Sequence, residues 1–292
     1  RDDTIDNVVN RNVVLIDECH IVKAESGVTT QIKKLKTNNI VGYTGTVPLA
    51  SEDDVNRWSV LGIIGKVICK TSSTELREKG YKSKAKIVAV NLKGCKHKPK
   101  FKEWIKVEVD GEMVKELVER DKGLVYKEEE EYLLKSQNRN LYVKKLIDKV
   151  CNGNTLIPID WNYHEDLLRE VYKDSDRVVY FLNGESTPEE RKRIYKKLET
   201  DTNSLLFVKT GIMREGISIK NLSHMVSFFA KKSYIRILQL LGRIERLGGN
   251  KVPIFWDIYD DSRKSKQHFE AREEIYNRDN IPVIKKEVKL DY

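Results

Sequence analysis

The sequence is poor in cysteine and contains no long apolar run. Its four cysteines, Cys19, Cys69, Cys95 and Cys151, lie far apart and form no CxxC pair. This spacing matches neither a zinc site nor the disulfide framework of a small secreted protein, so reduced thiols are expected. No run approaches the roughly 20 apolar residues that a spanning helix needs. The amino terminus, RDDTIDN, lacks signal-peptide character. These absences predict a cytoplasmic protein that does not enter a membrane.

A metal cluster is also absent from the pattern. Cys95 and His97 in GCKHKPK offer half of a metal site, but no second pair follows nearby, which favours a solvated basic loop.

The chain has 292 residues, of which 34% are charged, and a formal net charge of +9. This length allows two domains with a sizeable core. The basic balance is compatible with a polyanionic partner, although such a charge also occurs on proteins that never bind nucleic acid.

Short apolar runs alternate with segments of helical length. Continuous apolar runs suit strands buried on both faces of a parallel sheet, and their alternation with helices indicates an α/β fold. Thr187, Pro188 and Glu190 form a helix-start signal. The expected strands are VVLI (13–16), NIVGYT (39–44), TLIPI (155–159), RVVYFL (177–182), SLLFV (204–208), HMVSFF (224–229) and PIFWDIY (253–259). The expected helices span 138–150, 165–174, 188–199 and 233–248.

The stretch DECH directly follows the first expected strand. Asp17 and Glu18 would therefore lie at the carboxyl edge of a parallel sheet, where ligands of open α/β folds bind. There, Asp17 is suited to hold a hydrated Mg²⁺ and Glu18 to polarise a water for attack on a phosphoryl group. A solvated turn explains these four letters equally well.

Two further segments carry suitable chemistry. VGYTGTVP ends a second expected strand in Thr44-Gly45-Thr46, and adjacent strand ends would bring these hydroxyls to the acids. QLLGRIER places Gln239, Arg243 and Arg246 near one helix face, because residues three and four apart are neighbours. Two guanidinium groups can stabilise charge on a γ-phosphate. Taken alone, this segment is better explained as a basic helix face with Leu238, Leu240 and Leu241 in the core.

Taken in order, DECH, TGT, TGIMREGISIKNL and QLLGRIERLG resemble motifs II, III, V and VI of the superfamily 2 helicases of DExH/D type. Within that superfamily, GISIKNLSH (216–224) and WDIYDD (256–261) are similar to the phage recombination helicases. The resemblance covers about residues 12–275 and is weak between 85 and 130. It implies two RecA-like parallel-sheet domains, the first incomplete at its amino terminus. The implied divisions are 1–80 (end of domain 1), 81–135 (connector), 136–262 (domain 2) and 263–292 (helix and tail).

The resemblance also implies a role for individual residues. ATP and Mg²⁺ are the expected cofactors, with Asp17 as the Mg²⁺ acid, acting through a bound water, and Glu18 as the base. His20 would link to the second domain or to motif III, and Thr44 and Thr46 would couple nucleotide state to domain movement. Gly216 and Ser218 would line the nucleotide and the nucleic acid, and Thr210 would contact a strand phosphate. Gln239, Arg243 and Arg246 would reach ATP across the cleft.

One motif of the superfamily is missing from the sequence. The phosphate-cradling loop G-x-x-x-x-G-K-[ST] does not occur, and only 16 residues precede Asp17. The chain is therefore expected to be the carboxy-terminal part of a longer protein. By itself it is expected to bind ATP weakly and not to unwind DNA. Basic stretches such as KGCKHKPKFK (93–102) are candidates for part of a DNA-binding surface.

The function implied is an ATP-dependent helicase that remodels forks, recombination intermediates or R-loops in a phage-infected bacterial host. The expected partners are branched or single-stranded DNA, RNA within hybrids, and phage recombination or single-strand-binding proteins. Two alternatives remain open: another superfamily 2 translocase, such as the motor subunit of a restriction system, and a catalytically silent nucleic-acid-binding module.

Overall fold

The computed structural model describes residues 8–22, 26–45, 54–109, 112–213, 221–228, 242 and 252–292. The chain divides into two compact units, Arg1–Ser72 and Ser73–Tyr292. Within the described residues, no helix is both long and apolar enough to cross a membrane.

The first unit is built on two short parallel strands. Strand β1 (Val14–Ile16) pairs with β2 (Ile40–Gly42), so that Ile16 lies opposite Gly42. Cys19, Val22 and Val60 form a small core with the helices around these strands. Both strands were expected, but Leu15 is 64% exposed rather than buried on both faces. The helices are η1 (Cys19–Ile21), α2 (Gly27–Ile32) and α3 (Asp54–Ile64).

The second unit contains a seven-stranded sheet in which every described pairing is parallel. The predicted α/β class with a large parallel sheet is confirmed. The five strands expected in this unit form, because their continuous apolar runs can be buried on both faces. The order across the sheet is β11 (Val283–Lys289), β3 (Lys86–Lys93), β10 (Ile254–Asp260), β9 (His224–Ser227), β6 (Thr155–Ile159), β8 (Ser204–Lys209) and β7 (Val178–Leu182).

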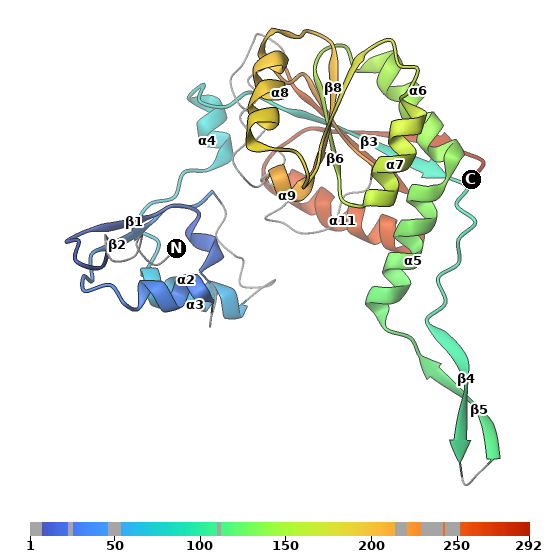
Figure 1. Cartoon of the computed structure of the whole chain (residues 1–292), viewed down its shortest axis with the longest axis horizontal. Helices are drawn as coiled ribbons and strands as arrows, with labels where there is room; N and C mark the ends of the chain where they lie inside the picture. Colours follow the sequence, from blue (N-terminus) through green and yellow to red (C-terminus); the bar gives the residue numbers. More distant parts are fainter. Residues whose placement is uncertain are drawn as a thin grey trace. The chain divides into compact units, whose positions relative to one another are not determined.

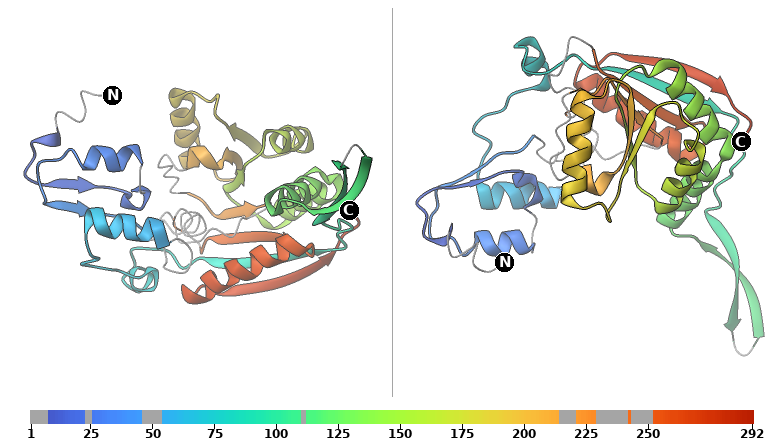
Figure 2. Two further views of the ribbon diagram at one scale, coloured as in Figure 1. Left: turned by 90° about the horizontal axis from the view of Figure 1, so that it is seen from below. Right: turned by 45° about the horizontal axis from the view of Figure 1, so that its top comes forward.

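Helices cover both faces of this sheet (Figure 1). One apolar cluster joins the strands to α8 (Pro188–Thr200), α9 (Thr210–Met213) and α11 (Arg263–Arg278). A second cluster joins them to α5 (Lys122–Lys135), α6 (Gln137–Val150) and α7 (Asn162–Val171). In Figure 2, right, α8 and the green helices lie on opposite sides of the strands. The core is therefore two layers deep, with the sheet between them.

Helix starts in this unit follow local capping chemistry. The Thr187 hydroxyl accepts the Glu190 N–H at 3.2 Å, and Pro188 occupies the first turn, as predicted. Helix α11 is capped from a different element: Glu129 of α5 accepts the backbone N–H groups of Lys264 and Ser265 at 2.9 and 3.0 Å. This buried carboxylate satisfies donors that a helix leaves unpaired at its start, and it fixes α5 against α11.

The structure differs from the sequence interpretation in the segment expected to be a connector. Residues 86–93 form β3, an inner strand with its six central residues buried between β10 and β11. The carboxy-terminal tail is also more ordered than expected, because β11 pairs with β3 as an edge strand. A short helix, α4 (Ser73–Glu78), precedes β3, and β4 (Lys102–Val109) and β5 (Glu112–Glu119) form an antiparallel hairpin.

Candidate functional site

Asp17 and Glu18 occupy a tight turn where β1 ends. The Glu18 backbone is left-handed, with φ 49° and ψ 42°, which is uncommon for a residue with a side chain. Asp17 Oδ1 accepts the Glu18 N–H at 2.8 Å and holds this turn. Strained backbone of this kind persists only where neighbouring contacts fix it, and it is found most often at sites of binding or catalysis.

His20 connects the acidic turn to the end of β2. Its Nδ1 lies 3.1 Å from Glu18 Oε2 and 2.9 Å from Thr44 Oγ1. A protonated Nδ1 donates to the carboxylate, whereas an unprotonated Nδ1 accepts the Thr44 hydroxyl proton. The predicted meeting of the DECH and TGT segments is confirmed in this contact, and the structure links His20 to Thr44 within the first unit.

Backbone pairing explains why these side chains meet. The Tyr43 N–H donates to Ile16 O at 2.8 Å, and the Cys19 N–H donates to Tyr43 O at 2.9 Å, so the pairing of the strands continues beyond their ends. Gly42 permits this close approach, because a Cβ there would lie 2.7 Å from Cys19 Sγ. The sequence interpretation missed Gly42, although a glycine inside a strand pattern is a recognised sign of close approach.

The acidic turn fits the hydrated Mg²⁺ that the resemblance implies. Mg²⁺ keeps several waters and is commonly held by one or two carboxylates together with substrate phosphates. Asp17 is exposed, and one of its oxygens is committed to the backbone of Glu18. Among the described residues there is no cluster of three or more His, Cys, Asp or Glu that could hold an ion without such waters. A water-mediated contact from Asp17 is therefore the arrangement that these residues support.

A second polar cluster lies at the carboxyl ends of the strands in the second unit. Thr210 follows β8, and its hydroxyl donates to Asp160, which follows β6. Beside them, the Lys209 Nζ lies 3.3 Å from the buried carboxylate of Glu165. Thr210 is thus placed at the edge where ligands of parallel sheets bind. Its expected phosphate contact stays a prediction.

Glu165 is the centre of this cluster. Burial acts to raise the pKa of its carboxyl, but hydrogen bonds from Arg169 and Asn183 and the charge of Lys209 hold the pKa below its ordinary value. Arg169 Nη2 and Asn183 Nδ2 both donate to Glu165 Oε1, at 2.7 and 3.0 Å. The carboxylate therefore stays ionised and joins α7 to the ends of β7 and β8.

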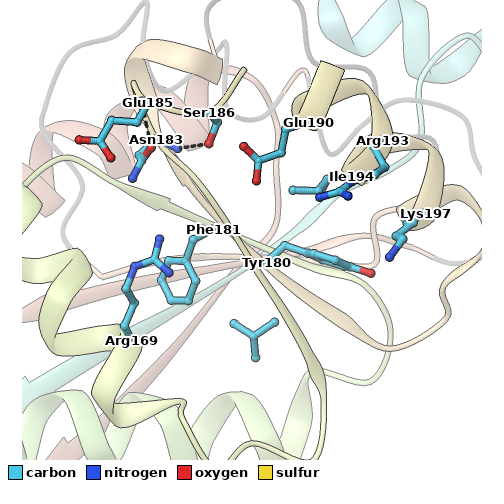
Figure 3. A pocket seen from close by; sticks show the side chains of 11 residues that line it. Arg169, Tyr180, Phe181, Asn183, Glu185, Ser186, Glu190, Arg193, Ile194 and Lys197 are labelled. Carbon is cyan, nitrogen blue, oxygen red and sulfur yellow. Dashed lines mark hydrogen bonds between the residues drawn. The ribbon is translucent and has the colours of Figure 1, made fainter. Parts of the chain in front are cut away.

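A pocket of about 400 Å³ lies beside edge strand β7 and next to this cluster. Figure 3 shows Arg169 on one side and Arg193 and Lys197 on the other, with the rings of Tyr180 and Phe181 between them. The Arg169 guanidinium stacks 4.1 Å from the centroid of Phe181. The cavity is lined by cations, by the acids Glu185 and Glu190 and by two aromatic rings, and it is suited to a polar ligand with a flat apolar part.

The sequence interpretation missed Asp160, Glu165, Asn183 and Lys209. The signal was present, because Asp160 and Asn183 directly follow apolar strands in the way Asp17 follows β1. The remaining predicted site residues lie outside the described residues: Thr46, Gly216, Ser218, Gln239, Arg243 and Arg246.

Comparison with known proteins gives this geometry a context. Residues 138–248 match the family model of the helicase conserved C-terminal domain. The chain is 24% identical over 253 residues to the ATP-dependent DNA helicase UvsW of Enterobacteria phage T4, covering 86% of this chain and 46% of the relative. It is 21% identical over 248 residues to putative helicase 22 of a Sulfolobus islandicus filamentous virus, covering 84% and 41%. The predicted resemblance to superfamily 2 helicases, including the carboxy-terminal part of UvsW, is confirmed.

Solved structures give the same fold. The crystal structure of T4 UvsW aligns with a TM-score of 0.55 at 19% identity, covering 98% of this chain and 57% of that chain. A fragment of a putative HsdR subunit of a type I restriction enzyme from Vibrio vulnificus aligns with a TM-score of 0.63 at 15% identity, covering 95% and 48%. The chain spans less than half the length of the curated relatives it matches.

Proposed function

We propose that the chain belongs to an ATP-dependent motor that acts on DNA, because residues 138–248 match the family model of the helicase conserved C-terminal domain. The observation that carries the proposal is the contact of Glu18, His20 and Thr44 at the ends of two adjacent parallel strands. An acidic pair joined to a hydroxyl on the next strand can transmit the state of a bound nucleotide to the backbone around it. A solvated turn has no need of such a link.

In this proposal, each group of residues has its own task. Glu18 orients and deprotonates the attacking water, and Asp17 holds hydrated Mg²⁺, which when bound neutralises phosphate charge. His20 and Thr44 link the water-binding turn to β2, so that a change at one alters the other. Gln239, Arg243 and Arg246 supply the guanidinium and amide groups that stabilise the transferred phosphoryl group.

The proposed substrate is branched DNA, such as forks, recombination intermediates and R-loops, processed during phage recombination, replication and repair. The support is the similarity to a phage protein named as an ATP-dependent DNA helicase. Thr210 is the proposed strand-phosphate contact, since its hydroxyl lies at the carboxyl edge of the sheet. Phage recombination and single-strand-binding proteins are the proposed partners, in the cytoplasm of the infected host.

The test is ATP hydrolysis by the full-length gene product, with and without forked DNA, beside a Glu18→Gln variant. Removing a catalytic base is expected to lower turnover by about 100-fold or more, with nucleotide binding retained. Glu75→Gln is the matched control, because this half-buried acid lies on α4, outside the proposed site, where it pairs with Lys79. Equal turnover in the Glu18 variant and the unaltered protein would reject the assigned base and favour the silent binding module.

A restriction-type translocase is the second candidate, favoured by the fold likeness to the HsdR fragment. Such a motor is distinguished by its product. A helicase releases single strands from a forked duplex, whereas a duplex translocase displaces a third strand bound to the duplex and leaves the two strands paired. Triplex displacement without strand release would move the assignment to the second candidate.

A further inference from the structure

The β4–β5 hairpin presents a face that no described element covers. It stands away from the sheet of the second unit, beyond the start of α5 (Figures 1 and 2). Residues paired across an antiparallel ladder point to the same face. Trp104 is paired with Leu117, and Lys106 with Lys115, and two-residue spacing puts both pairs on one face. We call this the Trp104 face.

The Trp104 face exposes an unusual amount of apolar surface. Trp104 is 67% exposed, and Met113 and Leu117 on the same face are 62% and 45% exposed. A two-stranded hairpin has little stability of its own in water, so large exposed rings on it are unfavourable unless something covers them. A tryptophan in this position indicates a binding surface.

Charge on the hairpin identifies what would cover it. Lys106 and Lys115 lie directly opposite each other, a like-charge pairing that destabilises a ladder on its own. Neither lysine forms an ion pair with another residue in the described parts of the chain. An anion between them would relieve the repulsion. Among the described side chains of this face, the acids are Glu108, opposite Met113, and Glu119, opposite Lys102 at the base.

The opposite face has a different character. Val107 pairs with Val114 there, and the charged residues among its described side chains are Glu103 and Glu116. This face is otherwise aliphatic, and because Glu103 is paired with Arg120, Glu116 carries the charge that would repel a polyanion. The hairpin therefore has one face that complements phosphate and rings and one that does not.

The base of the hairpin fixes its direction. Arg120 bridges Glu103 of β4 and Glu128 of α5, with Nε–Oε2 and Nη2–Oε1 distances of 3.3 and 2.5 Å. Phe101 lies beneath the Arg263 guanidinium of α11 at 4.8 Å. These contacts tie the hairpin to two helices of the unit, so the Trp104 face is presented in a defined orientation and is not a freely moving loop.

We propose that the Trp104 face binds single-stranded DNA, with Trp104 stacking on an unpaired base and Lys106 and Lys115 contacting its phosphates. The proposal rests on the proposed function for the choice of DNA. Stacking on an aromatic ring combined with basic side chains is how proteins bind single strands without sequence preference. The basic stretch 93–102, which leads directly into β4, adds exposed Lys98 and Lys100 next to the hairpin in the chain.

The test measures binding of the 292-residue chain to a fluorescent oligothymidylate by anisotropy, without nucleotide. Trp104→Ala is expected to raise Kd about 5-fold or more, the loss typical of one stacked base, and Trp104→Phe is expected to retain part of the affinity. Lys106→Ala with Lys115→Ala is expected to reduce the slope of log Kd against log salt by about 1.4, because two single-strand phosphate contacts are lost.

Val114→Ala and Glu116→Gln, on the opposite face, are the matched controls and are expected to stay within 2-fold of the unaltered chain. Circular dichroism and melting temperature verify that each variant is folded. Unchanged Kd in Trp104→Ala, equal weakening in Val114→Ala, or tighter binding of the matching RNA would each overturn the assignment. ATP hydrolysis by the full-length product is a separate measurement, so Trp104-dependent binding without turnover would leave this inference standing and reject the motor.

Discussion

At the scale of single residues, the acidic turn combines backbone strain with close packing. Glu18 adopts its left-handed conformation where its carboxylate meets His20 Nδ1, and Thr44 reaches the same nitrogen from β2. One imidazole nitrogen therefore has two competing partners. Nδ1 donates to Glu18 when it is protonated and accepts the Thr44 hydroxyl proton when it is not. A change in the charge on Glu18 therefore alters the hydrogen bond made by Thr44. This local coupling is the link that the proposed motor would use.

Gly42 is expected to be essential for that contact. In Gly42→Ala, the new methyl group would lie 2.7 Å from both Cys19 Sγ and Ile64 Cγ2, and relieving this overlap should destabilise the first unit by about 1–3 kcal/mol. Gly62→Ala is the control in the same unit, because no atom lies within 4 Å of its added Cβ. Urea unfolding of the chain compares the two variants. Equal midpoints would contradict the packing argument.

His164 is expected to make stability depend on pH. Burial, together with nearby Arg139 and Lys209, lowers its pKa to about 3, with Asp160 opposing, so the imidazole is neutral in the folded chain. In the unfolded chain the pKa is about 6.5, and the unfolded state binds the extra proton between these values. The contribution of His164 to the free energy of unfolding is therefore fully present above pH 6.5, and it is lost as the pH falls towards 3.

The measurement is the free energy of unfolding at pH 7 and pH 5. From pH 7 to pH 5, His164 should account for a loss of roughly 2 kcal/mol. A His164→Gln variant retains a polar group for Asn140, whose Oδ1 lies 3.3 Å from the imidazole Nε2. Between pH 7 and pH 5, this variant should therefore lose roughly 2 kcal/mol less of its free energy of unfolding than the unaltered chain. The same pH dependence in both proteins would exclude His164 as the source.

At the scale of elements, Glu129 determines how α5 and α11 are held together. Its Oε1 accepts from the Ser262 hydroxyl at 2.6 Å as well as from two backbone N–H groups at the start of α11, and the side chain is fully buried. Glu129→Ala leaves these donors unsatisfied and should destabilise the second unit by about 2–4 kcal/mol. Glu129→Gln keeps an acceptor oxygen and should be milder.

Glu131→Ala is the control on the same helix, because this exposed acid only pairs with Lys135 four residues on. Exposed pairs of this kind contribute about 0.3–0.5 kcal/mol. Denaturant midpoints of the three variants should therefore rank Glu131→Ala as the most stable, then Glu129→Gln, then Glu129→Ala. A Glu129→Ala midpoint as high as that of Glu131→Ala would refute the capping role.

The elements that were predictable from sequence are those whose local pattern agrees with their tertiary position. TLIPI and SLLFV became β6 and β8 because an uninterrupted apolar run can only be buried on both faces. The sequence VIKKEVK became β11 despite its charges, because an edge strand buries only part of one face. The run KIVAVNLK was missed because it lies in a Lys- and Glu-rich region, and its pairing with β10 joins residues far apart in the chain.

The candidate site was predictable in part for a related reason. The sequence predicted the turn after β1 because acids follow an apolar run. It predicted the contact with Thr44 because the ends of adjacent parallel strands meet at one edge of a sheet. The link through His20 Nδ1 and the cluster around Glu165 depend on side-chain distances that no spacing reveals. Glu165 in particular lies within a helical pattern, where its sequence position indicates only a solvated acid.

At the scale of the whole molecule, the second unit has what an independent domain needs. Its sheet is covered on both faces by separate apolar clusters, whereas the buried core of the first unit, within its described residues, consists of three residues with a few partly buried neighbours. A chain of residues 73–292 is therefore expected to fold alone and to unfold in one cooperative transition. Its melting temperature should lie within about 3 °C of the main transition of the whole chain.

Comparing chains that begin at residue 73 and at residue 81 tests where this domain begins. Arg77 of α4 donates from Nη1 to the Asp279 carbonyl at 2.7 Å, at the end of α11. A chain of residues 81–292, which begins where the sequence interpretation placed the start of the connector, lacks this contact. It should melt several degrees lower than 73–292, because one partly buried hydrogen bond from a charged group contributes about 1.5–3 kcal/mol. In 73–292, Arg77→Ala should reproduce most of the difference. Identical melting of 73–292 and 81–292 would show that α4 contributes no stability to the domain.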